Sequence, residues 1–245
     1  MMAMNQPPEE PPPSWRALAG ELFPEGFEIV EEDDLLIGSG RCGPHTLTVL
    51  GTSNHVEVGV EISLAMAREV IATVRSHPRR AILFLMDTQG QRLRHRDEML
   101  GLNSYMAHLG KSIQVARDHD HRVLGLVYDQ ALSGGFIASA MAADVCAALP
   151  HAEIRVMNFA AMARVTRIAE DRLRALAGIS PVFAPGAINF VRMGAVEPLW
   201  EGKLALRLQD ALASADASDH RAQRGLDRGG RSLAFPVAQR VSNDG

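Results

Sequence analysis

Cysteine is scarce in this sequence, and its scarcity excludes two classes of small scaffold. Cys42 and Cys146 are the only cysteines among 245 residues, and neither belongs to a CxxC pair. A disulfide framework and a zinc knuckle both need more cysteines at closer spacing, so we expect neither. Two isolated thiols suit a reducing compartment, and we expect the protein in the cytoplasm.

A basic excess and long apolar runs are missing as well. The chain has 25 Lys and Arg against 29 Asp and Glu, which gives a formal net charge of -4 and a pI of about 6.1. Nucleic-acid binding calls for a clustered basic face. A membrane span needs about 18 consecutive apolar residues, and a secretory signal needs a basic start followed by an apolar run. We therefore expect neither nucleic acid nor membrane as a partner.

The composition is that of an ordinary folded enzyme-sized domain. Hydrophobic residues make up 47% of the chain and charged residues 22%, which supports one substantial core. Residues 1–14 are rich in proline and are expected to be disordered. Residues 215–245 contain Gly229, Gly230 and several aspartates, and are expected to form a weakly structured tail. The folded domain is then predicted at residues 15–214.

Strand and helix patterns alternate through this domain. Apolar positions recur at helical spacing over 57–76 and from Asp97 to Ala116, and continuous apolar runs predict strands. Such alternation predicts an α/β fold with a mainly parallel sheet and a functional crevice at the carboxyl ends of its strands. The predicted strands are 46–50, 81–86, 122–128 and 145–149, and the other predicted helices are 136–143, one capped by Asn158, 168–177 and 185–193.

Two glycines follow the third of these strands, in the stretch Ser133-Gly134-Gly135. Glycine leaves backbone N–H groups open to a ligand, and at a helix amino terminus such groups can stabilise an oxyanion. The same glycines would also serve tight packing between helix and strand. Ser133 does not fit a nucleophile elbow, because GxSxG would need glycine at position 131, where alanine stands.

A second polar stretch, Asp87-Thr88-Gln89-Gly90, follows the strand predicted at 81–86. Parallel strands end on one rim of a sheet, so this stretch is expected near the glycine pair. Asp87 would cap the following loop in a structural role, whereas Thr88, Gln89 and Gly90 would line the crevice in a functional one. Both interpretations remain open from spacing alone.

No metal site is expected from the sequence. The segment 118–121, Asp-His-Asp-His, has residue types that bind metals. Its position at the end of a predicted helix, just before Arg122, favours a solvated turn.

The two polar stretches together resemble motifs of the crotonase-type fold of acyl-thioester carboxyltransferases and decarboxylases. In the alpha-type half of acetyl-CoA carboxylase carboxyltransferase, a DTPG motif and a longer GGSGGA motif occupy the places of 87–90 and 132–136. Here the extra glycines before the serine are absent and Phe136 replaces a small residue, a departure at the site that this family uses for biotin. The chain is more similar to the gamma subunit of biotin-independent malonate decarboxylase, from about residue 35 to 212 and again at 228–234.

This resemblance implies a spiral of ββα units and a complex with a homologous beta subunit. The complex would decarboxylate malonyl thioesters on an acyl carrier protein to acetyl thioesters. Gly134, Gly135 and Ser133 would be the catalytic residues, with the two glycines as backbone donors to an oxyanion. Which subunit binds the thioester oxygen and which binds the departing carboxylate stays open. The substrate-binding residues would be Asp87, Thr88, Gln89, Gly90 and Phe136. This chain would bind no cofactor, because the thioester prosthetic group, of the phosphoribosyl-dephospho-CoA type, would belong to the carrier protein.

Three other functions remain open. The chain could be a carboxyltransferase subunit. It could also be a stand-alone crotonase-like hydratase or isomerase of CoA thioesters, which would need acid–base carboxylates that the helix after the glycine pair lacks. A third possibility is a non-catalytic scaffold that completes the beta subunit's crevice.

Overall fold

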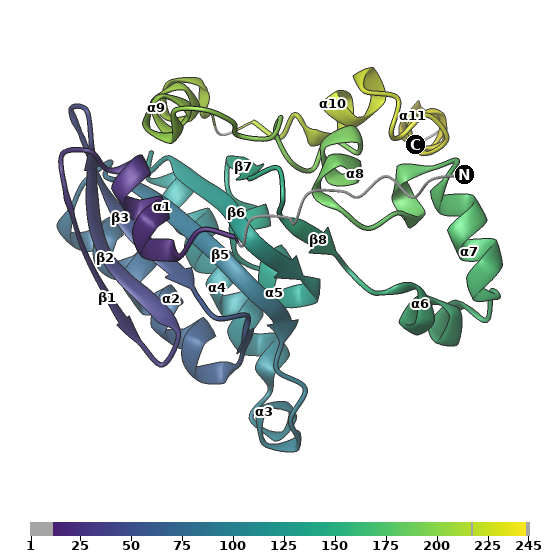
Figure 1. The fold of residues 1–245 in the computed structure, drawn as a ribbon, viewed down its shortest axis with the longest axis horizontal. Coiled ribbons are helices and arrows are strands. Elements are labelled where there is room, and N and C mark those ends of the chain that lie inside the picture. Colours follow the sequence, from purple (N-terminus) through teal and green to yellow (C-terminus); the bar gives the residue numbers. More distant parts are fainter. Residues whose placement is uncertain (1–11, 217, 244–245) are drawn as a thin grey trace, which may run out of the picture.

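A computed structural model describes residues 12–216 and 218–243 (Figure 1). Residues 1–11, most of the segment predicted to be disordered, lie outside the described residues. The strands are β1 (Phe27–Glu32), β2 (Leu35–Cys42), β3 (His45–Thr52), β4 (Val56–Val58), β5 (Ala81–Gln91), β6 (Val123–Leu132), β7 (Val145–Ala148) and β8 (Glu153–Arg155). The helices are α1 (Trp15–Leu22), α2 (Val60–Ser76), α3 (His95–Met99), α4 (Leu102–Asp118), α5 (Ser133–Ile137), α6 (Phe159–Thr166), α7 (Glu170–Ala177), α8 (Ala187–Arg192), α9 (Leu204–Ser214), α10 (Arg221–Asp227) and α11 (Ala234–Asn243), with 3-10 turns at Ala140–Ala142 and Pro181–Phe183.

Parallel pairing forms the middle of the sheet, as the alternating pattern predicted. The strand order is β1-β2-β3-β5-β6-β7, and β3, β5, β6 and β7 run parallel. The antiparallel strands β1 and β2 were not predicted. β1 is an edge strand without a buried residue, so it lacks the apolar run that identifies a central strand.

Hydrophobic clusters cover both faces of this sheet. In β5, Ala81, Leu83 and Leu85 pack with α1 and α9. The alternate residues Ile82, Phe84 and Met86 pack with α2 and α4. Figure 1 shows α1 in front of the strands and α2 and α4 behind them. Both faces are covered because side chains of a strand point alternately to the two sides.

β5 and β6 continue beyond the main sheet and pair with two short strands. β4 pairs with the end of β5, and β8 pairs with the end of β6. The register shifts between Met86 and Thr88, where β5 leaves the main sheet. The stretch 87–90 was predicted to follow a strand, but it lies inside β5, which ends at Gln91. The apolar run ends at Met86 because the rest of the strand no longer pairs with β3 and pairs with β4 instead.

The helix predicted from Asp97 onward is divided in two. α3 ends at Met99 and α4 begins at Leu102, and Gly101 between them has a φ of 76°. A left-handed residue ends a helix, and glycine adopts this conformation at little cost. The apolar periodicity continues across the break, which is why the sequence predicted one helix.

The carboxyl-terminal region is more ordered than predicted. α9 ends at Ser214, where the folded domain was predicted to end. The tail predicted to be weakly structured contains α10 and α11, which lie beside α8 in Figure 1. Arg228, just after α10, donates hydrogen bonds to the carbonyls of Val191 and Val196, so the tail is attached to the body. None of the helices in the described part of the chain is both long and apolar enough to cross a membrane.

Candidate functional site

The two glycine-containing stretches meet where β5 ends and α5 begins. Gly90 has a φ of 105°, and a Cβ on it would lie 2.8 Å from the Leu132 carbonyl oxygen. A Cβ on Gly135 would lie 3.0 Å from the carbonyl carbon of Gly90. The stretches are therefore in backbone contact, and neither position has room for a side chain. This proximity confirms that the two stretches share one edge of the sheet.

Ser133 begins the turn in a strained conformation. Its φ is 50°, in the left-handed region that serine rarely occupies. The Ser133 hydroxyl donates a 2.6 Å hydrogen bond to the Val156 carbonyl. Strain of this kind persists where surrounding structure enforces it, and it is frequent at functional sites.

The Gly134 amide has a side-chain partner. The half-buried Gly134 donates a 2.8 Å hydrogen bond to the side-chain oxygen of Gln91. Gly135, the next residue, is buried. The helix dipole contributes little here, because α5 has only five residues. Any stabilisation of an oxyanion must come from the amides themselves.

The other residues predicted to bind substrate are placed differently from one another. Thr88 is buried, and its hydroxyl donates to the Val56 carbonyl at 2.6 Å. Gln89 is exposed. Phe136 is 1% exposed and packs edge to face on Phe190, with ring centroids 6.4 Å apart. Thr88 and Phe136 thus support the turn from inside, and Asp87 faces a separate pocket.

An apolar pocket of about 350 Å³ opens beside the Ser133 turn. Val156, whose carbonyl accepts the Ser133 hydrogen bond, is one of its lining residues. The pocket lies among β8, α6 and α8, and its other lining residues include Met157, Met162, Val165 and Phe190.

The pocket that Asp87 faces is polar, and its volume is about 460 Å³. The His55 Nε2 atom lies 2.7 Å from Asp129 Oδ2 and 3.4 Å from Asp87 Oδ1. The backbone amides of His55 and Gln130 also donate to Asp87, at 2.9 and 3.3 Å. These residues come from the turn after β3 and from the adjacent strands β5 and β6.

Burial and negative charge shape the electrostatics of this polar pocket. Burial raises the pKa of Asp87, and the Asp129 charge adds to the rise, while the His55 amide opposes it. Burial also raises the pKa of Tyr128, with a further contribution from Asp87 and Asp129. At the outer rim, a hydrogen bond from Ser53 lowers the pKa of Glu31.

Sequence reasoning did not identify Gln91, His55 or Asp129 as site residues. A signal for Asp129 exists, because it follows the apolar run of β6 as Asp87 follows that of β5, and Met86 pairs with Val127 in the sheet. Gln91 and His55 contact residues that are far from them in the sequence, Gly134 and Asp129. Local patterns carry no signal for such contacts.

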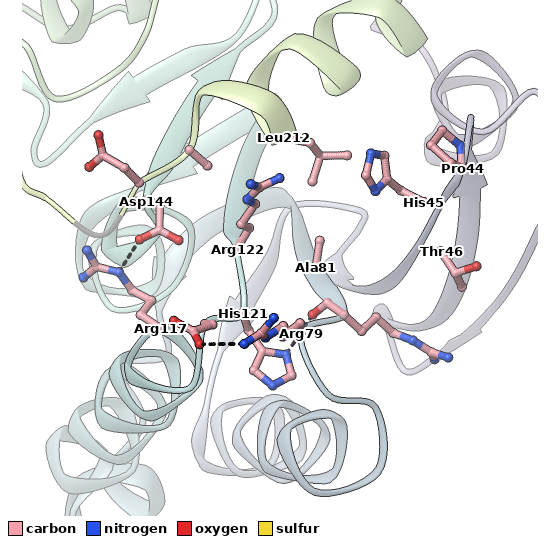
Figure 2. Close-up of a pocket in the computed structure, with 14 residues that line it drawn as sticks. Pro44, His45, Thr46, Arg79, Ala81, Arg117, His121, Arg122, Asp144 and Leu212 are labelled. Carbon is pink, nitrogen blue, oxygen red and sulfur yellow. Dashed lines mark hydrogen bonds and ion pairs between the residues drawn. The ribbon is translucent and has the colours of Figure 1, made fainter.

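A third cavity lies at the opposite ends of the strands (Figure 2). It has a volume of about 660 Å³ and is lined by Thr46, Ala81 and Arg122 at the starts of β3, β5 and β6. The dashed lines in Figure 2 include an ion pair of Arg117 with Asp144 at 2.5 Å. Because the glycine turn is at the carboxyl ends of the strands, this cavity is separate from it.

The segment 118–121 lies along the same cavity. Asp120 forms an ion pair with Arg79 at 3.7 Å. The ring of His121 is buried, and its Nδ1 atom lies 2.8 Å from the Arg80 carbonyl. The ring of His119 contacts the Val115 carbonyl at 2.8 Å. Each of these side chains contacts the surrounding protein rather than its neighbours in the segment.

Comparisons with solved structures show the fold. A chain of a Pseudomonas malonate decarboxylase hetero-tetramer in complex with coenzyme A superimposes with a TM-score of 0.76 and 22% identity, over 95% of this chain and 100% of that one. The Pseudomonas MdcD-MdcE hetero-dimer gives 0.72 and 25% identity, over 94% and 96% of the two chains. Transcarboxylase 12S gives 0.67 and 17%, over 82% of this chain and 42% of that one. The fold is thus the crotonase-type α/β fold of carboxyltransferases.

Sequence comparison identifies the family. The chain is 29% identical over 153 residues to the malonyl-S-ACP:biotin-protein carboxyltransferase of Malonomonas rubra. The matched region covers 59% of this chain and 52% of the relative. It therefore spans about half the length of that relative. The model of the malonate decarboxylase gamma subunit family matches residues 53–244, well over half of the sequence. The chain belongs to the malonate decarboxylase gamma subunit family.

Proposed function

We propose that this chain acts with a homologous beta subunit to decarboxylate a malonyl thioester on an acyl carrier protein, producing the acetyl thioester. Family membership supports this proposal, as do the similar Pseudomonas assemblies with coenzyme A and with malonate. The Malonomonas rubra relative acts on malonyl-S-ACP. The thioester prosthetic group would belong to the carrier protein.

The observation that carries the proposal is the Gly134 amide at the Ser133 turn, which donates to a movable side chain, that of Gln91. When the bond between the carboxylate and the α-carbon breaks, CO₂ leaves and the bonding electron pair forms an enolate, which later takes a proton at carbon. Backbone N–H groups fixed in advance stabilise the enolate oxygen as its charge develops. Gly134 offers such a group to an acceptor, and Gly135 follows it in the same turn.

Gln91 occupies the place that we assign to the substrate oxygen. Its side-chain oxygen is a carbonyl oxygen, and it accepts from Gly134 at 2.8 Å, within the range required of an oxyanion donor. In the proposed reaction, the Gln91 side chain turns away and the thioester oxygen takes its position. Gln91 is only half-buried, so this movement requires no change in the core.

Gly134→Val tests this assignment. A Cβ at Gly134 would meet the mobile ends of Gln91 and Met106, at 2.8 and 3.1 Å, so the fold can adjust. We expect the complex to assemble and CO₂ release from malonyl carrier to fall at least about tenfold, because the side chain blocks approach to the amide. Gly135→Val is less suitable, because its Cβ would contact the Gly90 backbone.

Gly20→Val is the matched control. Gly20 lies on the exposed side of α1, and a Cβ there would meet nothing within 4 Å. This variant should assemble and retain its activity. If Gly134→Val assembles and keeps full activity, the turn has no catalytic role and the chain serves only as a scaffold for its partner.

Carboxyl transfer to biotin is the second candidate function, favoured by the Malonomonas rubra relative. The two reactions differ in the fate of the carboxyl group, which leaves as CO₂ in one and is transferred to biotin in the other. A complex supplied with malonyl carrier and treated with avidin distinguishes them. Continued CO₂ release supports decarboxylation, and its loss supports transfer.

A further inference from the structure

The polar pocket around His55 is chemically distinct from the glycine turn. Asp87 and Gly90 both lie in β5, separated by about 10 Å along the strand. Asp87 faces the pocket on the α1 side of the sheet, which is lined by Ser14 and Trp15 among others. The proposed reaction uses no group in this pocket.

We propose that His55, Asp87 and Asp129 form a binding site for a divalent first-row transition-metal ion. Each residue offers one ligand atom, and the three atoms lie within 4.8 Å of one another. One imidazole nitrogen with two carboxylate oxygens is a ligand set that suits zinc and its neighbours in the first row.

The distances between these atoms suit a shared ion. Metal bonds of about 2.0–2.2 Å place neighbouring ligand atoms about 3.0–3.5 Å apart. His55 Nε2 is 3.4 Å from Asp87 Oδ1 and 2.7 Å from Asp129 Oδ2. The second distance must lengthen slightly, which a small rotation of the half-exposed His55 ring allows. The His55 side chain is 38% exposed, against 5% for Asp87.

The backbone holds two of the ligands in place before an ion arrives. Asn54 and His55 both have a φ of 53°, so the turn after β3 directs the His55 ring toward the carboxylates. The amides of His55 and Gln130 fix the Asp87 carboxylate. Such outer contacts orient ligands in metal sites. The cavity of about 460 Å³ leaves room for water or a small ligand on the open side of the ion.

The charges around the site also favour a cation. Asp87, Asp129 and Glu31 all line the pocket. Arg16 is paired with Glu31 at 3.0 Å, and therefore does not neutralise the two aspartates. His55 is the group that contacts both of them. A doubly charged ion would compensate this pair of carboxylates more fully than one imidazolium.

The test is metal binding by the untagged full chain, or by its complex with the beta subunit, after treatment with a chelator. Equilibrium dialysis against Zn²⁺ should give one ion per chain, and Co²⁺ should give the visible absorption of a bound ion. Zn²⁺ should also raise the unfolding temperature, because it binds only the folded site. Neither readout depends on decarboxylation, so failure here leaves the proposed function intact.

Two variants and a control make the test specific. His55→Asn removes the imidazole, and asparagine tolerates the left-handed backbone at this position. Asp129→Asn removes a carboxylate ligand but keeps the hydrogen bonds that the His55 and Gln130 amides donate to Asp87. Each should weaken Zn²⁺ binding at least about tenfold, with an unchanged circular dichroism spectrum. His77→Ala, at the exposed end of α2, should bind as the native chain does.

Three results would overturn the proposal. The first is the absence of saturable Zn²⁺ or Co²⁺ binding, which would leave the cluster as an ion pair alone. The second is binding that both folded variants retain. The third is an equal loss of binding in His77→Ala.

Discussion

Gln91 is the residue whose side chain contacts the Gly134 amide. Its side-chain oxygen accepts a hydrogen bond from this amide. The two residues are 43 positions apart in sequence. A contact of this kind forms only when β5 and β6 lie side by side in the folded sheet.

Gln91→Ala should lower KM for the malonyl carrier and leave kcat nearly unchanged. The substitution removes a group that competes with substrate in the ground state, and such a change affects binding rather than the chemical step. Steady-state CO₂ release by the assembled complex measures both constants. Gln223→Ala, on the exposed side of α10, is the control. A higher KM in Gln91→Ala would mean that the side chain helps to bind substrate.

At the residue scale, the sequence predicted where the glycine turn lies but not the side chains around it. Glycine at 134 and 135 suited either ligand approach or tight packing, and Gly135 packs closely on the backbone of Gly90, whose φ of 105° needs glycine. The roles of Gln91 and His55 depend on tertiary contacts that no local pattern encodes. Phe136 was assigned to the substrate, yet its ring is buried against Phe190, because an aromatic next to a glycine pair fits a core equally well.

Helix α6 is the element that depends most on its cap. None of its side chains is buried, and the Asn158 side chain accepts a 2.8 Å hydrogen bond from the Ala161 amide. The sequence predicted this cap correctly, because capping involves residues only a few positions apart. Besides this cap, the first turn is contacted by Arg174, whose guanidinium lies 4.7 Å from the centre of the Phe159 ring.

Asn158→Ala should destabilise α6 locally by about 1 kcal/mol. Hydrogen exchange should accelerate in the amides of 159–166, while the global unfolding temperature stays nearly constant. Asn158→Asp, which keeps the acceptor, is the control and should restore protection. Unchanged exchange in Asn158→Ala would show that other contacts hold the helix.

The elements that were not predicted share a physical cause. β1 is an edge strand with charged residues, and the break at Gly101 interrupts a periodicity that continues on both sides. The end of β5 is polar, and it pairs with the short strand β4 rather than with β3. In each case the neighbours of the segment, rather than its own composition, determine its structure.

On the scale of the whole molecule, the carboxyl-terminal segment completes the fold. Arg228 donates to the carbonyls of Val191 and Val196 at 2.8 and 2.9 Å, and to Glu197 at 3.2 Å. Arg224 also pairs with Glu197. The family match extends through this region to residue 244. The sequence suggested a loose tail because of its glycines and aspartates, whereas the contacts named here come from its arginines.

Arg228→Met should destabilise the folded chain by on the order of 2 kcal/mol, since carbonyls at the end of α8 lose a charged donor. For a domain of this size, that corresponds to a fall in Tm of about 4–8 °C. Arg240→Met, on the exposed face of α11, is the matched control and should melt like the native chain. Equal melting of the two variants in differential scanning calorimetry would argue that the segment does not stabilise the body.

β5 limits which sequence changes the polar pocket and the glycine turn can tolerate. The strand is hydrogen-bonded to β3, β4 and β6, and Asp87 and Gly90 are both part of it. These hydrogen bonds fix the distance along the strand between the polar pocket and the glycine turn. Insertion or deletion of one residue between positions 87 and 90 would reverse the facing of one end, so this segment should tolerate substitutions far better than changes in length.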